Sequence, residues 1–414
     1  MGTRLRPATR LVHGALRTEL RLVITRRLRT ARLGTAAAFF LTGLVFATWA
    51  ARIPARKADL GLSDSDLAIA FVGLNAGAVA GLQVGAVVVT RLGSRRAVTV
   101  ALPVFAALLL AIAHAGSLVT LTLALAVSAM ANSVVDVAIN DQGVGLQASY
   151  GRPVLSGLHA MHSLGGVAGG GLAALAAALG GGVAVHFTLV AVGTVVLGLL
   201  ASRTLLPPAE LHSASAEHGE HSTWLSGWSG RLLLLGGLAF VFTFAEGTAL
   251  DWSAVLLRDS HHTSAAVAAT ALAVFQAAVT LGRLGGDRLI GRLGPVTVFR
   301  LGALVAGGGF AAGLLIGTAW SALAGLGLLG LGLANLLPIS IGAAGADRNL
   351  PVAVAVARVS AMGYLGSFTG PAAIGVLAHL GSLPAALLLP AIGVAITAAA
   401  APVVRTSPSA PRRG

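Results

Sequence analysis

The sequence predicts an all-α membrane protein with twelve transmembrane helices in two pseudo-symmetric six-helix bundles. Hydrophobic residues make up 56% of the 414 residues, charged residues only 10%, and the mean hydropathy is +0.87. A soluble globular chain has about 25% charged residues. A membrane span needs about 20 apolar residues to cross about 30 Å of hydrocarbon. Twelve segments meet this requirement, at about residues 33–51, 67–90, 97–114, 117–139, 156–180, 183–203, 231–255, 264–286, 296–317, 319–341, 353–379 and 383–404.

The two halves of the chain carry matching residues at a constant spacing of 201 positions. In a first block, the repeated residues are Gly81, Gly85, Arg91, Leu92 and Gly93, which recur as Gly282, Gly286, Arg292, Leu293 and Gly294. In a second block they are Ala160, Met161, Leu164, Gly165 and Gly169, which recur as Ala361, Met362, Leu365, Gly366 and Gly370. Chance matching of Gly/Ala/Leu-rich helices is the alternative, but two separate blocks hold the same spacing. In so apolar a chain, a repeat of about half the length is typical of a two-bundle transporter.

Basic residues cluster at alternate ends of the predicted spans. Nine arginines, from Arg4 to Arg32, precede the first span, and further arginines occupy every second connector. The other connectors hold four basic residues, Arg52, Arg56, Lys57 and Arg258. That leaves 28 − 4 = 24 basic residues on or near one side. The positive-inside rule places this side, with both chain termini, in the cytoplasm, which requires an even number of spans. The net charge of +14 is thus explained by topology in a bacterial cytoplasmic membrane, and no nucleic-acid partner is expected.

The predicted spans divide the chain into five segments. We expect a basic cytoplasmic N-terminal tail (1–32), an N-terminal six-helix bundle (33–206), a cytoplasmic linker (207–230), a C-terminal six-helix bundle (231–404) and a cytoplasmic tail (405–414). The N-terminal tail is interpreted as a disordered positive segment rather than as an amphipathic helix on the membrane surface. The linker is polar, and its three histidines are interpreted as solvated rather than as metal ligands.

Two arginine-rich turns follow the second and the eighth predicted span. The first reads Ala86-Val-Val-Val-Thr90-Arg91-Leu-Gly93-Ser-Arg95-Arg96, and in the second Gly282-Arg283-Leu-Gly-Gly286-Asp287-Arg288 leads into Arg292-Leu-Gly294. Both turns resemble the signature between the second and third helices of the major facilitator superfamily, G-x-x-x-D-R-x-G-x-R-R, and its repetition six helices later. The resemblance implies the MFS fold, and a cytoplasmic gate in which these charges meet the opposing bundle and help to hold one face closed.

The gate that the resemblance implies consists of Arg91, Arg95, Asp287, Arg288 and Arg292. The usual acidic position of the first turn is occupied by Thr90, so that half lacks its acid, whereas Asp287 keeps an acid in the second half. The alternative is that these arginines only mark the cytoplasmic side and set the topology.

Four further stretches narrow the resemblance. They are Trp49-Ala-Ala-Arg52-Ile-Pro54, Asp136-Val-Ala-Ile-Asn140-Asp141-Gln142-Gly143, Gly151-Arg152-Pro153 with the segment after it, and Glu246-Gly-Thr-Ala-Leu-Asp251-Trp252 with the segment after it. Together they resemble a poorly characterised bacterial branch of the superfamily, related to fucose-permease-like sugar transporters, over about residues 33–404. Those transporters carry an acidic residue and an asparagine on the fourth helix, matched here by Asp136 and Asn140. Their acid on the first helix has no counterpart, so their proton mechanism does not transfer as a whole.

Ionisable side chains inside the spans are the main candidates for a substrate and proton pathway, because each costs about 2.5–3.5 kcal/mol on insertion scales. The carboxylates in this position are Asp136, Glu246 and Asp251. Asn132 and Asn140 lie four residues on either side of Asp136, so these three side chains project from one helical face, which we expect to line a central cavity. The alternatives are a structural hydrogen bond between helices for Asp136 and a pair with a neighbouring polar group for Glu246.

His159 and His162 are three residues apart on the fifth span and share a face. We expect them to bind substrate or relay protons; structural polar packing is the alternative, and a metal site is not expected because no carboxylate or cysteine accompanies them. Trp49 and Trp252 lie near the outer ends of the first and seventh spans. They are candidates for stacking on a sugar-like ligand, and the alternative is a position in the interfacial aromatic belt.

These observations together predict a secondary active transporter that moves a small solute by alternating access. The expected partners are a small-molecule substrate, of which a sugar or sugar acid is the favoured class, protons, and the lipid bilayer; the chain is expected to work as a monomer. Proton-driven efflux of a drug or secondary metabolite is the alternative. Exporters of the superfamily often carry a Gly-Pro motif on the fifth helix. The fifth span here has no proline after Ser163, whereas Gly370 and Pro371 are adjacent on the eleventh.

No cofactor is expected. The chain has no cysteine, and it has no G-x-x-x-x-G-K-S/T motif, which disfavours ATP-driven transport. An intramembrane enzyme would use Ser156 with His159, or Ser163 with His162, as nucleophile and base. Neighbouring positions on one helix rarely align such a pair, and no third orienting group is evident. The sequence therefore predicts a transporter and not an enzyme.

Overall fold

The structure is a computed structural model that describes residues 7–207, 228–263, 265–347 and 350–405, with the backbone alone described for residues 7–25, 54, 64, 65, 68, 265, 266 and 269. Helices account for all regular secondary structure in these ranges. They are α1 (Pro7–Ala50), α2 (Ile53–Asp59), α3 (Asp64–Leu92), α4 (Ser94–Ala113), α5 (Leu118–Tyr150), α6 (Leu155–Ala178), α7 (Val183–Ser202), α9 (Gly230–Val255), η2 (Leu256–Ser260), α10 (Ala265–Leu293), α11 (Pro295–Ile316), α12 (Ala319–Leu333), α13 (Leu336–Gly345), α14 (Val352–Leu380), α15 (Leu383–Ile396) and η3 (Thr397–Val404).

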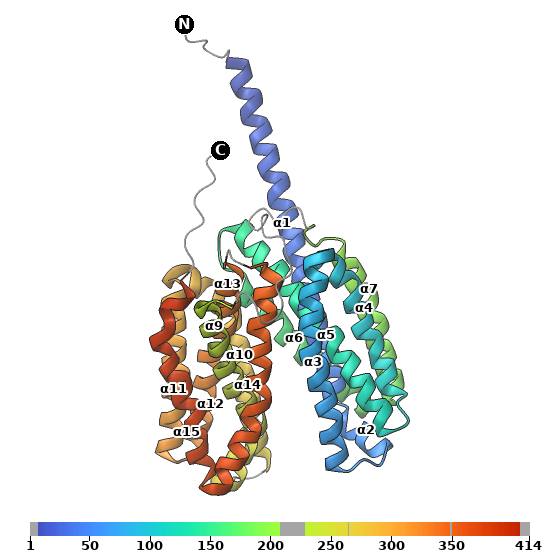
Figure 1. Cartoon of the computed structure of the whole chain (residues 1–414), viewed down its shortest axis with the longest axis vertical. Helices are drawn as coiled ribbons and strands as arrows, with labels where there is room; N and C mark the ends of the chain where they lie inside the picture. Colours follow the sequence, from blue (N-terminus) through green and yellow to red (C-terminus); the bar gives the residue numbers. More distant parts are fainter. Residues whose placement is uncertain (1–6, 208–227, 264, 348–349, 406–414) are drawn as a thin grey trace.

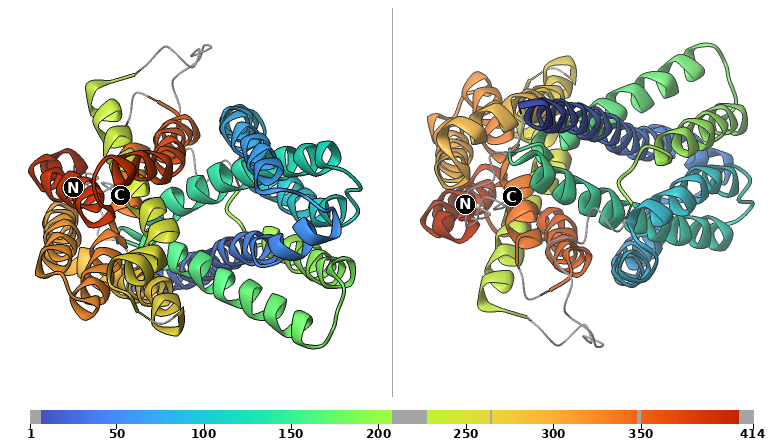
Figure 2. Two further views of the ribbon diagram at one scale, coloured as in Figure 1. Left: turned by 90° about the horizontal axis from the view of Figure 1, so that it is seen from below. Right: turned by 90° about the horizontal axis from the view of Figure 1, so that it is seen from above.

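The helices form two groups that correspond to the two halves of the chain. Helices α1 to α7 lie together on one side and α9 to η3 on the other, as the views along the helix axes show (Figure 2). Each group has its own cluster of buried apolar residues. The start of α1 and the end of η3 lie at the same face, called here the termini face (Figure 1). At the opposite face the ribbons of α3 and α14 diverge (Figure 1). The predicted two-bundle, all-α fold is confirmed.

Eleven of the predicted spans lie in helices that are long and apolar enough to cross a membrane, within the described residues. The remaining one, predicted at about 264–286, lies in α10, a continuous helix of 29 residues from Ala265 to Leu293. Its last turns carry Arg283, Asp287, Arg288 and Arg292. The charged end of α10 thus contributes residues of the candidate site and of the predicted gate described below.

Helix α1 is much longer than predicted, because the basic N-terminal segment continues the first span. The helix begins at Pro7 and runs without a break to Ala50, over 44 residues. Proline is favoured at the first helical position, and the arginines, leucines and alanines that follow are good helix formers. The interpretation of this segment as disordered is wrong for residues 7–32. In Figure 1 this part of α1 projects beyond the ends of the other helices on the termini face.

The tenth predicted span is divided into two helices, α12 and α13, at Ala334 and Asn335. Pro338 explains the division, because proline has no backbone N–H to donate to the carbonyl four residues earlier, which here belongs to Ala334. The Ala334 carbonyl is therefore available to another helix. It accepts a hydrogen bond from Arg283 Nε of α10, at 3.3 Å, and Asn335 Nδ2 donates to the Gly282 carbonyl at 3.1 Å.

The glycines repeated between the halves mark equivalent close contacts between helices. Gly165 of α6 lies against the backbone carbonyl of Phe40 on α1, and Gly366 of α14 lies against that of Phe240 on α9 in the same way. The first block of repeated residues behaves alike, with Gly81 and Gly282 against the backbones of Met130 and Leu331. A Cβ atom at Gly81, Gly165 or Gly366 would collide with backbone of the facing helix, and one at Gly282 would collide with the Ala334 side chain. Small residues therefore hold the helices together in each bundle, as helix association in lipid requires.

Two arginines of the opposite face have a structural function. Arg52 is 8% exposed and donates from Nη2 to the carbonyl of Gly181 at 2.5 Å; Arg56 is 7% exposed and donates from Nη2 to the carbonyl of Ala115 at 2.6 Å. Both acceptors lie just beyond the C-terminal ends of helices, where backbone carbonyls lack intrahelical partners and cations are favourable. These arginines are therefore buried packing groups rather than solvated surface charges.

We expect reporter fusions to place the termini face in the cytoplasm. A fusion after Leu211, outside the described residues, should report cytoplasm, because most basic residues lie on that side. Fusions near His114, Leu179, Leu257 and Leu380 should report the outer side, since these residues lie at helix ends on the opposite face. A cytoplasmic signal at two or more of those four positions would contradict the twelve-span topology.

Candidate transport site and gate

A chain of polar side chains crosses the first bundle between α5 and α6. Asn140 Nδ2 donates to Asp136 Oδ1 at 3.0 Å and to the Asp136 carbonyl at 2.9 Å. His159 Nε2 lies 3.2 Å from Asn140 Oδ1, within hydrogen-bonding distance. Asn140 is fully buried. Asp136 and Asn140 of the predicted stripe therefore form one connected group with His159 of the fifth span.

His162, one helical turn further along α6, is held against α1. Its Nδ1 lies 3.2 Å from the hydroxyl of Thr42, and Gly43 lies against its backbone carbonyl. Gly43 permits this close approach because a Cβ at that position would collide with the carbonyl. The ring of His159 packs on Phe39, with ring centroids 5.0 Å apart. Both histidines are thus fixed by α1, and they reach the same region from the same face of α6.

Arg283 of α10 joins this group to the second bundle. Its Nη1 donates to the hydroxyl of Ser163 on α6 at 2.8 Å, and its Nη2 lies 3.6 Å from Glu246 Oε1 on α9. Its Nε donates to the Ala334 carbonyl that Pro338 leaves available. The guanidinium is 12% exposed, and the Glu246 side chain 28%. The positive charge of Arg283 on α10 is therefore held between the two bundles by two partners from the second bundle, Glu246 and Ala334, and one from the first, Ser163.

Electrostatic contacts between the bundles extend the group. Arg283 lies within electrostatic range of both His159 and His162. Tyr364 of α14, in the second bundle, lies within electrostatic range of Asp136. The arrangement places one carboxylate in each bundle, with two imidazoles and one guanidinium between them. Such groups can bind hydroxyl or carboxyl groups of a solute and can accept or release protons.

The polar residues of this group are not repeated in the other half of the chain, unlike the glycines at the helix contacts. Asp136, Asn140, His159 and His162 are 201 residues before Leu337, Ile341, Ser360 and Gly363. Glu246 and Arg283 are 201 residues after Val45 and Leu82. By contrast, Thr42 corresponds to another threonine, Thr243. Thr42 lies beside His162, and Thr243 donates a hydrogen bond to the carbonyl of Gly363, the residue that corresponds to His162. The packing is therefore common to both halves, and the ionisable groups belong to one half each.

The remaining predicted pathway residues lie outside this group. Asn132 is partly buried one turn before Asp136 and has no hydrogen bond among the described residues. Asp251 is exposed towards the opposite face. Trp252 donates its indole N–H to the carbonyl of Pro371 at 3.1 Å, so its position is fixed by packing of α9 on α14. Trp49 is 5% exposed in the core of the first bundle. Their roles in substrate binding stay predictions.

Arg283, Ser163, Thr42 and Tyr364 were not predicted as site residues. A signal for Arg283 was present, since a charged residue nine positions before the Arg-Leu-Gly turn falls inside a span. It was assigned to the turn motif instead. Thr42, Ser163 and Tyr364 carry no signal of this kind, because hydroxyl groups are common in membrane helices.

At the termini face, Asp287 of α10 connects the bundles through the start of α6. Its Oδ1 accepts from the Ser156 backbone N–H and its Oδ2 from the Gly157 N–H, both at 3.0 Å. A carboxylate at a helix N-terminus satisfies unpaired N–H groups and interacts favourably with the helix dipole. Arg32 and Arg152 lie within electrostatic range of this carboxylate. Asp287 therefore bonds the end of α10 to α6 across the interface.

The other predicted gate residues lie around this contact. Arg91, Arg288 and Arg292 are exposed at the termini face. Arg95 donates from Nη2 to the carbonyl of Arg203, within the first bundle, at 3.1 Å. Within the described part of the chain, neither Arg91 nor Arg292 forms an ion pair with Asp287. The contact across the interface is thus made by a carboxylate and backbone N–H groups, and the gate function of all five residues stays a prediction.

The bundles approach closely beside Asp287. Gly286 lies so near Ser156 of α6 and Asn335 that a Cβ there would collide with both side chains. Ala353, Ala357 and Ala361 of α14 are buried in the cluster of the first bundle. All of these contacts are in the half of the molecule next to the termini face. The structure is therefore closed at that end. Among the described residues, no group of three His, Asp or Glu side chains is arranged to hold a metal ion.

Comparisons with known proteins agree with this architecture. A family model described as Major Facilitator Superfamily matches residues 35–350. The chain is 34% identical over 373 residues to an uncharacterised MFS-type transporter of Yersinia pestis, a match that covers 90% of this chain and 95% of that protein. It is 33% identical over 381 residues to the uncharacterised transporter y4wD of Sinorhizobium fredii, covering 92% of this chain and all of that protein, 100%.

Solved structures share the fold. The fucose:proton symporter FucP of E. coli, in an outward conformation, matches with a TM-score of 0.76 at 16% identity, over 91% of this chain and 99% of that chain. The proton:xylose symporter XylE matches with a TM-score of 0.68 at 12% identity, over 91% of this chain and 95% of that chain. These identities show the fold alone. With the family model and the two uncharacterised relatives, they establish that this multi-pass membrane protein belongs to the Major Facilitator Superfamily.

Proposed function

We propose that this transporter takes up a small polar solute, of the sugar or sugar-acid class, together with protons across the cytoplasmic membrane. The observation that carries the proposal is the connected group Asp136, Asn140 and His159 in the first bundle, placed next to the Arg283–Glu246 pair of the second. Ionisable groups inside membrane spans are costly and mark substrate and proton pathways. A site between two bundles is accessible from alternate sides when the bundles rock.

The composition of the group favours a polar solute over a hydrophobic drug. Asn140, the two histidines, Ser163 and Arg283 supply hydrogen-bond donors and acceptors, which match the hydroxyl or carboxyl groups of a sugar or sugar acid. FucP and XylE, which share the fold, are described as proton symporters of fucose and of xylose. The Gly370–Pro371 step, which favoured export, lies where the Pro371 carbonyl accepts the Trp252 indole. Gly370 and Pro371 thus have a role in the packing of α14 on α9.

The proposal is tested by uptake into proteoliposomes that contain the purified protein. A panel of labelled monosaccharides and sugar acids is added with a pH gradient, acidic outside. We expect at least one of them to accumulate in a gradient-dependent way, with unlabelled analogues competing. Accumulation of none of them, together with acid-driven extrusion of hydrophobic cations preloaded into the vesicles, would contradict the proposal and support the efflux alternative.

Removal of the Asp287 charge is expected to open the termini face. Asp287→Asn loses the carboxylate that accepts two backbone N–H groups of α6. Hydrogen bonds to a charged group contribute about 1.5–3 kcal/mol, so the ratio of open to closed states should rise about tenfold or more. The natural chain has no cysteine, so in the variant Ala357→Cys a thiol-reactive label can react only at position 357. Ala357 is 1% exposed and buried against the first bundle. Its labelling rate in inside-out vesicles should rise with Asp287→Asn.

Arg91→Ala tests the alternative that this residue of the predicted gate only sets the topology. Arg91 is exposed at the same face and forms no hydrogen bond to the second bundle within the described ranges. Its removal should leave the labelling rate of Ala357→Cys unchanged while reducing the amount of inserted protein, if it acts through topology. Equal labelling rates for Asp287→Asn and the natural sequence would show that the Asp287 contact does not hold the face closed.

A further inference from the structure

An apolar groove with a basic entrance lies on the outer surface of the first bundle, away from the transport site. Its volume is about 820 Å³. Helices α3 and α4 form its sides and α5 its floor. The apolar lining includes Val88, Leu92, Ala101, Val104, Ala131 and Val134. The walls expose hydrophobic side chains: Val100 is 65% exposed, Leu92 50% and Val104 45%. This surface faces the lipid that surrounds the bundle.

The end of the groove at the termini face carries two positive charges. Arg95 and Arg96 are in its lining and belong to the first turn of α4, which begins at Ser94. Val104 lies eight residues further along the same helix than Arg96, or about 12 Å at the rise of an α-helix. Among the residues that the structure describes, no carboxylate lines the groove. The surface thus has a cationic end at the membrane interface and an apolar channel that leads into the hydrocarbon.

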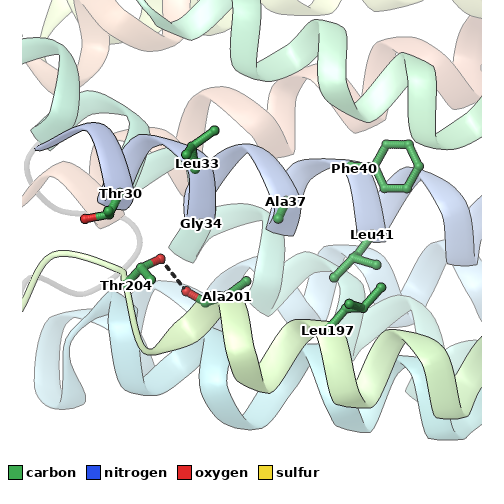
Figure 3. Close-up of a pocket in the computed structure, with 9 residues that line it drawn as sticks. All are labelled: Thr30, Leu33, Gly34, Ala37, Phe40, Leu41, Leu197, Ala201 and Thr204. Carbon is green, nitrogen blue, oxygen red and sulfur yellow. Dashed lines mark hydrogen bonds between the residues drawn. The ribbon is translucent and has the colours of Figure 1, made fainter. Parts of the chain in front are cut away.

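A second groove, between α1 and α7, lacks this charge. It has a volume of about 350 Å³, and the described residues that line it are apolar residues and two threonines, with no charged side chain among them (Figure 3). The Thr204 hydroxyl donates to the Ala201 carbonyl, as Figure 3 shows, and the Thr30 hydroxyl donates to the Arg27 carbonyl, both at 2.8 Å. The two threonine hydroxyls of this groove thus bond to backbone carbonyls three residues earlier in the chain. It therefore offers a surface for acyl chains without a partner for a headgroup.

We propose that the groove between α3 and α4 binds an anionic phospholipid of the surrounding leaflet, with the headgroup phosphate at Arg95 and Arg96 and an acyl chain along α4. Arginine suits this role because its planar guanidinium forms paired hydrogen bonds to phosphate. Basic pockets between transmembrane helices on the cytoplasmic side bind anionic headgroups by the same physics. The ligand is thus a membrane component, and the site is separate from the solute pathway.

The second half of the chain supports a dedicated function for this pair of arginines. Arg91 and Arg292 occupy equivalent positions of the repeat, but Arg95 and Arg96 correspond to Val296 and Thr297. The second half therefore keeps the arginine of the turn and lacks the pair that lines the groove. In the second half, Arg288 and Arg292 at the same face supply the positive charge that sets the membrane topology. The topology therefore does not require a pair of arginines at the positions of Arg95 and Arg96.

The test measures lipid retention by native mass spectrometry of the purified full-length transporter. Dioleoyl phosphatidylglycerol is compared with dioleoyl phosphatidylcholine, which has the same acyl chains and no net charge. We expect preferential binding of phosphatidylglycerol to the natural sequence. At about 1 kcal/mol for each arginine near the surface, the double variant Arg95→Ala with Arg96→Ala should weaken phosphatidylglycerol binding about 30-fold. Arg96→Gln alone, which leaves the Arg95–Arg203 contact intact, should weaken it about fivefold.

Two controls separate the headgroup, the acyl chain and the general surface charge. Arg288→Ala with Arg292→Ala removes the same charge from the same face and should not change phosphatidylglycerol binding. Ala101→Trp, which fills the groove, should reduce retention of both phospholipids. Equal retention of the two phospholipids, or an equal loss with Arg288→Ala and Arg292→Ala, would overturn the proposal. Competition by free glycerol phosphate as strong as by the phospholipid would also overturn it, because the ligand would then be a soluble phosphate.

Discussion

Asp136→Asn is expected to abolish accumulation of solute against its gradient while solute exchange continues. Asparagine keeps the size of aspartate and can still hydrogen-bond to Asn140, but it cannot bind and release a proton. The protein should therefore fold and insert normally, and it should equilibrate solute across the membrane. The measurement is the ratio of internal to external solute at steady state in proteoliposomes under an imposed pH gradient, together with the rate of solute counterflow. The ratio should fall to about 1, the value at equilibrium without coupling.

Asp251→Asn is the matched control for this substitution. Asp251 is also a carboxylate within a predicted span, but it is exposed and lies away from the connected group. Its substitution should leave the accumulation ratio unchanged. Uphill transport by Asp136→Asn at the level of the natural sequence would show that proton coupling resides elsewhere. Loss of accumulation in Asp251→Asn alone would assign the coupling to the second bundle.

Arg283→Ala is expected to abolish transport and to destabilise the protein strongly. The substitution removes the partner of Glu246 and the bond to Ser163 between the bundles. Breaking a buried ion pair by removing one partner costs about 3–5 kcal/mol, because it leaves an uncompensated charge. Glu246 is 28% exposed, so the loss should be near the lower end of that range. Thermal unfolding in detergent measures the stability, and uptake and counterflow measure the transport.

A double variant separates the two effects of this substitution. Arg283→Leu with Glu246→Leu removes both charges, so no uncompensated charge remains, and most of the stability should return. Transport should remain absent if the pair takes part in solute binding. Arg300→Ala is the matched single control, because Arg300 of α11 also donates from Nε to a backbone carbonyl, that of Ala398, but lies outside the site. Normal uptake by the double variant would show that the pair is purely structural.

The fold was predictable because the physics that specifies it is local and repetitive. About 20 apolar residues suffice to define a span, and the arginines between spans define its orientation. The residues repeated at 201 positions predicted two related halves, and the repeated glycines Gly165 and Gly366 each lie against the carbonyl of a phenylalanine on the neighbouring helix. The length of α1 was missed, because arginine-rich composition was interpreted as disorder although arginine is a good helix former.

The candidate site was predictable within one helix and not between helices. Asp136 and Asn140 are four residues apart, so helical geometry alone places them together. Arg283 is far from Ser163, Glu246 and Ala334 in sequence, and only the tertiary packing brings the four together. The partner of Asp287 was missed for another reason. Backbone N–H groups have no sequence signature, so the start of α6 could not be recognised as the partner in place of an arginine.

The claim that solute and protons cross together, with Asp136 as the group that binds the proton, is tested most directly by proton movement that the solute drives. Proteoliposomes with a pH-sensitive dye inside are given a saturating concentration of the transported solute, with no initial pH gradient. We expect the interior to acidify as solute enters, and no acidification with Asp136→Asn, although counterflow shows that solute still crosses. Solute entry by the unmodified protein without any change in internal pH would contradict proton-coupled uptake, because Asp136 and its partners would then bind solute without moving protons.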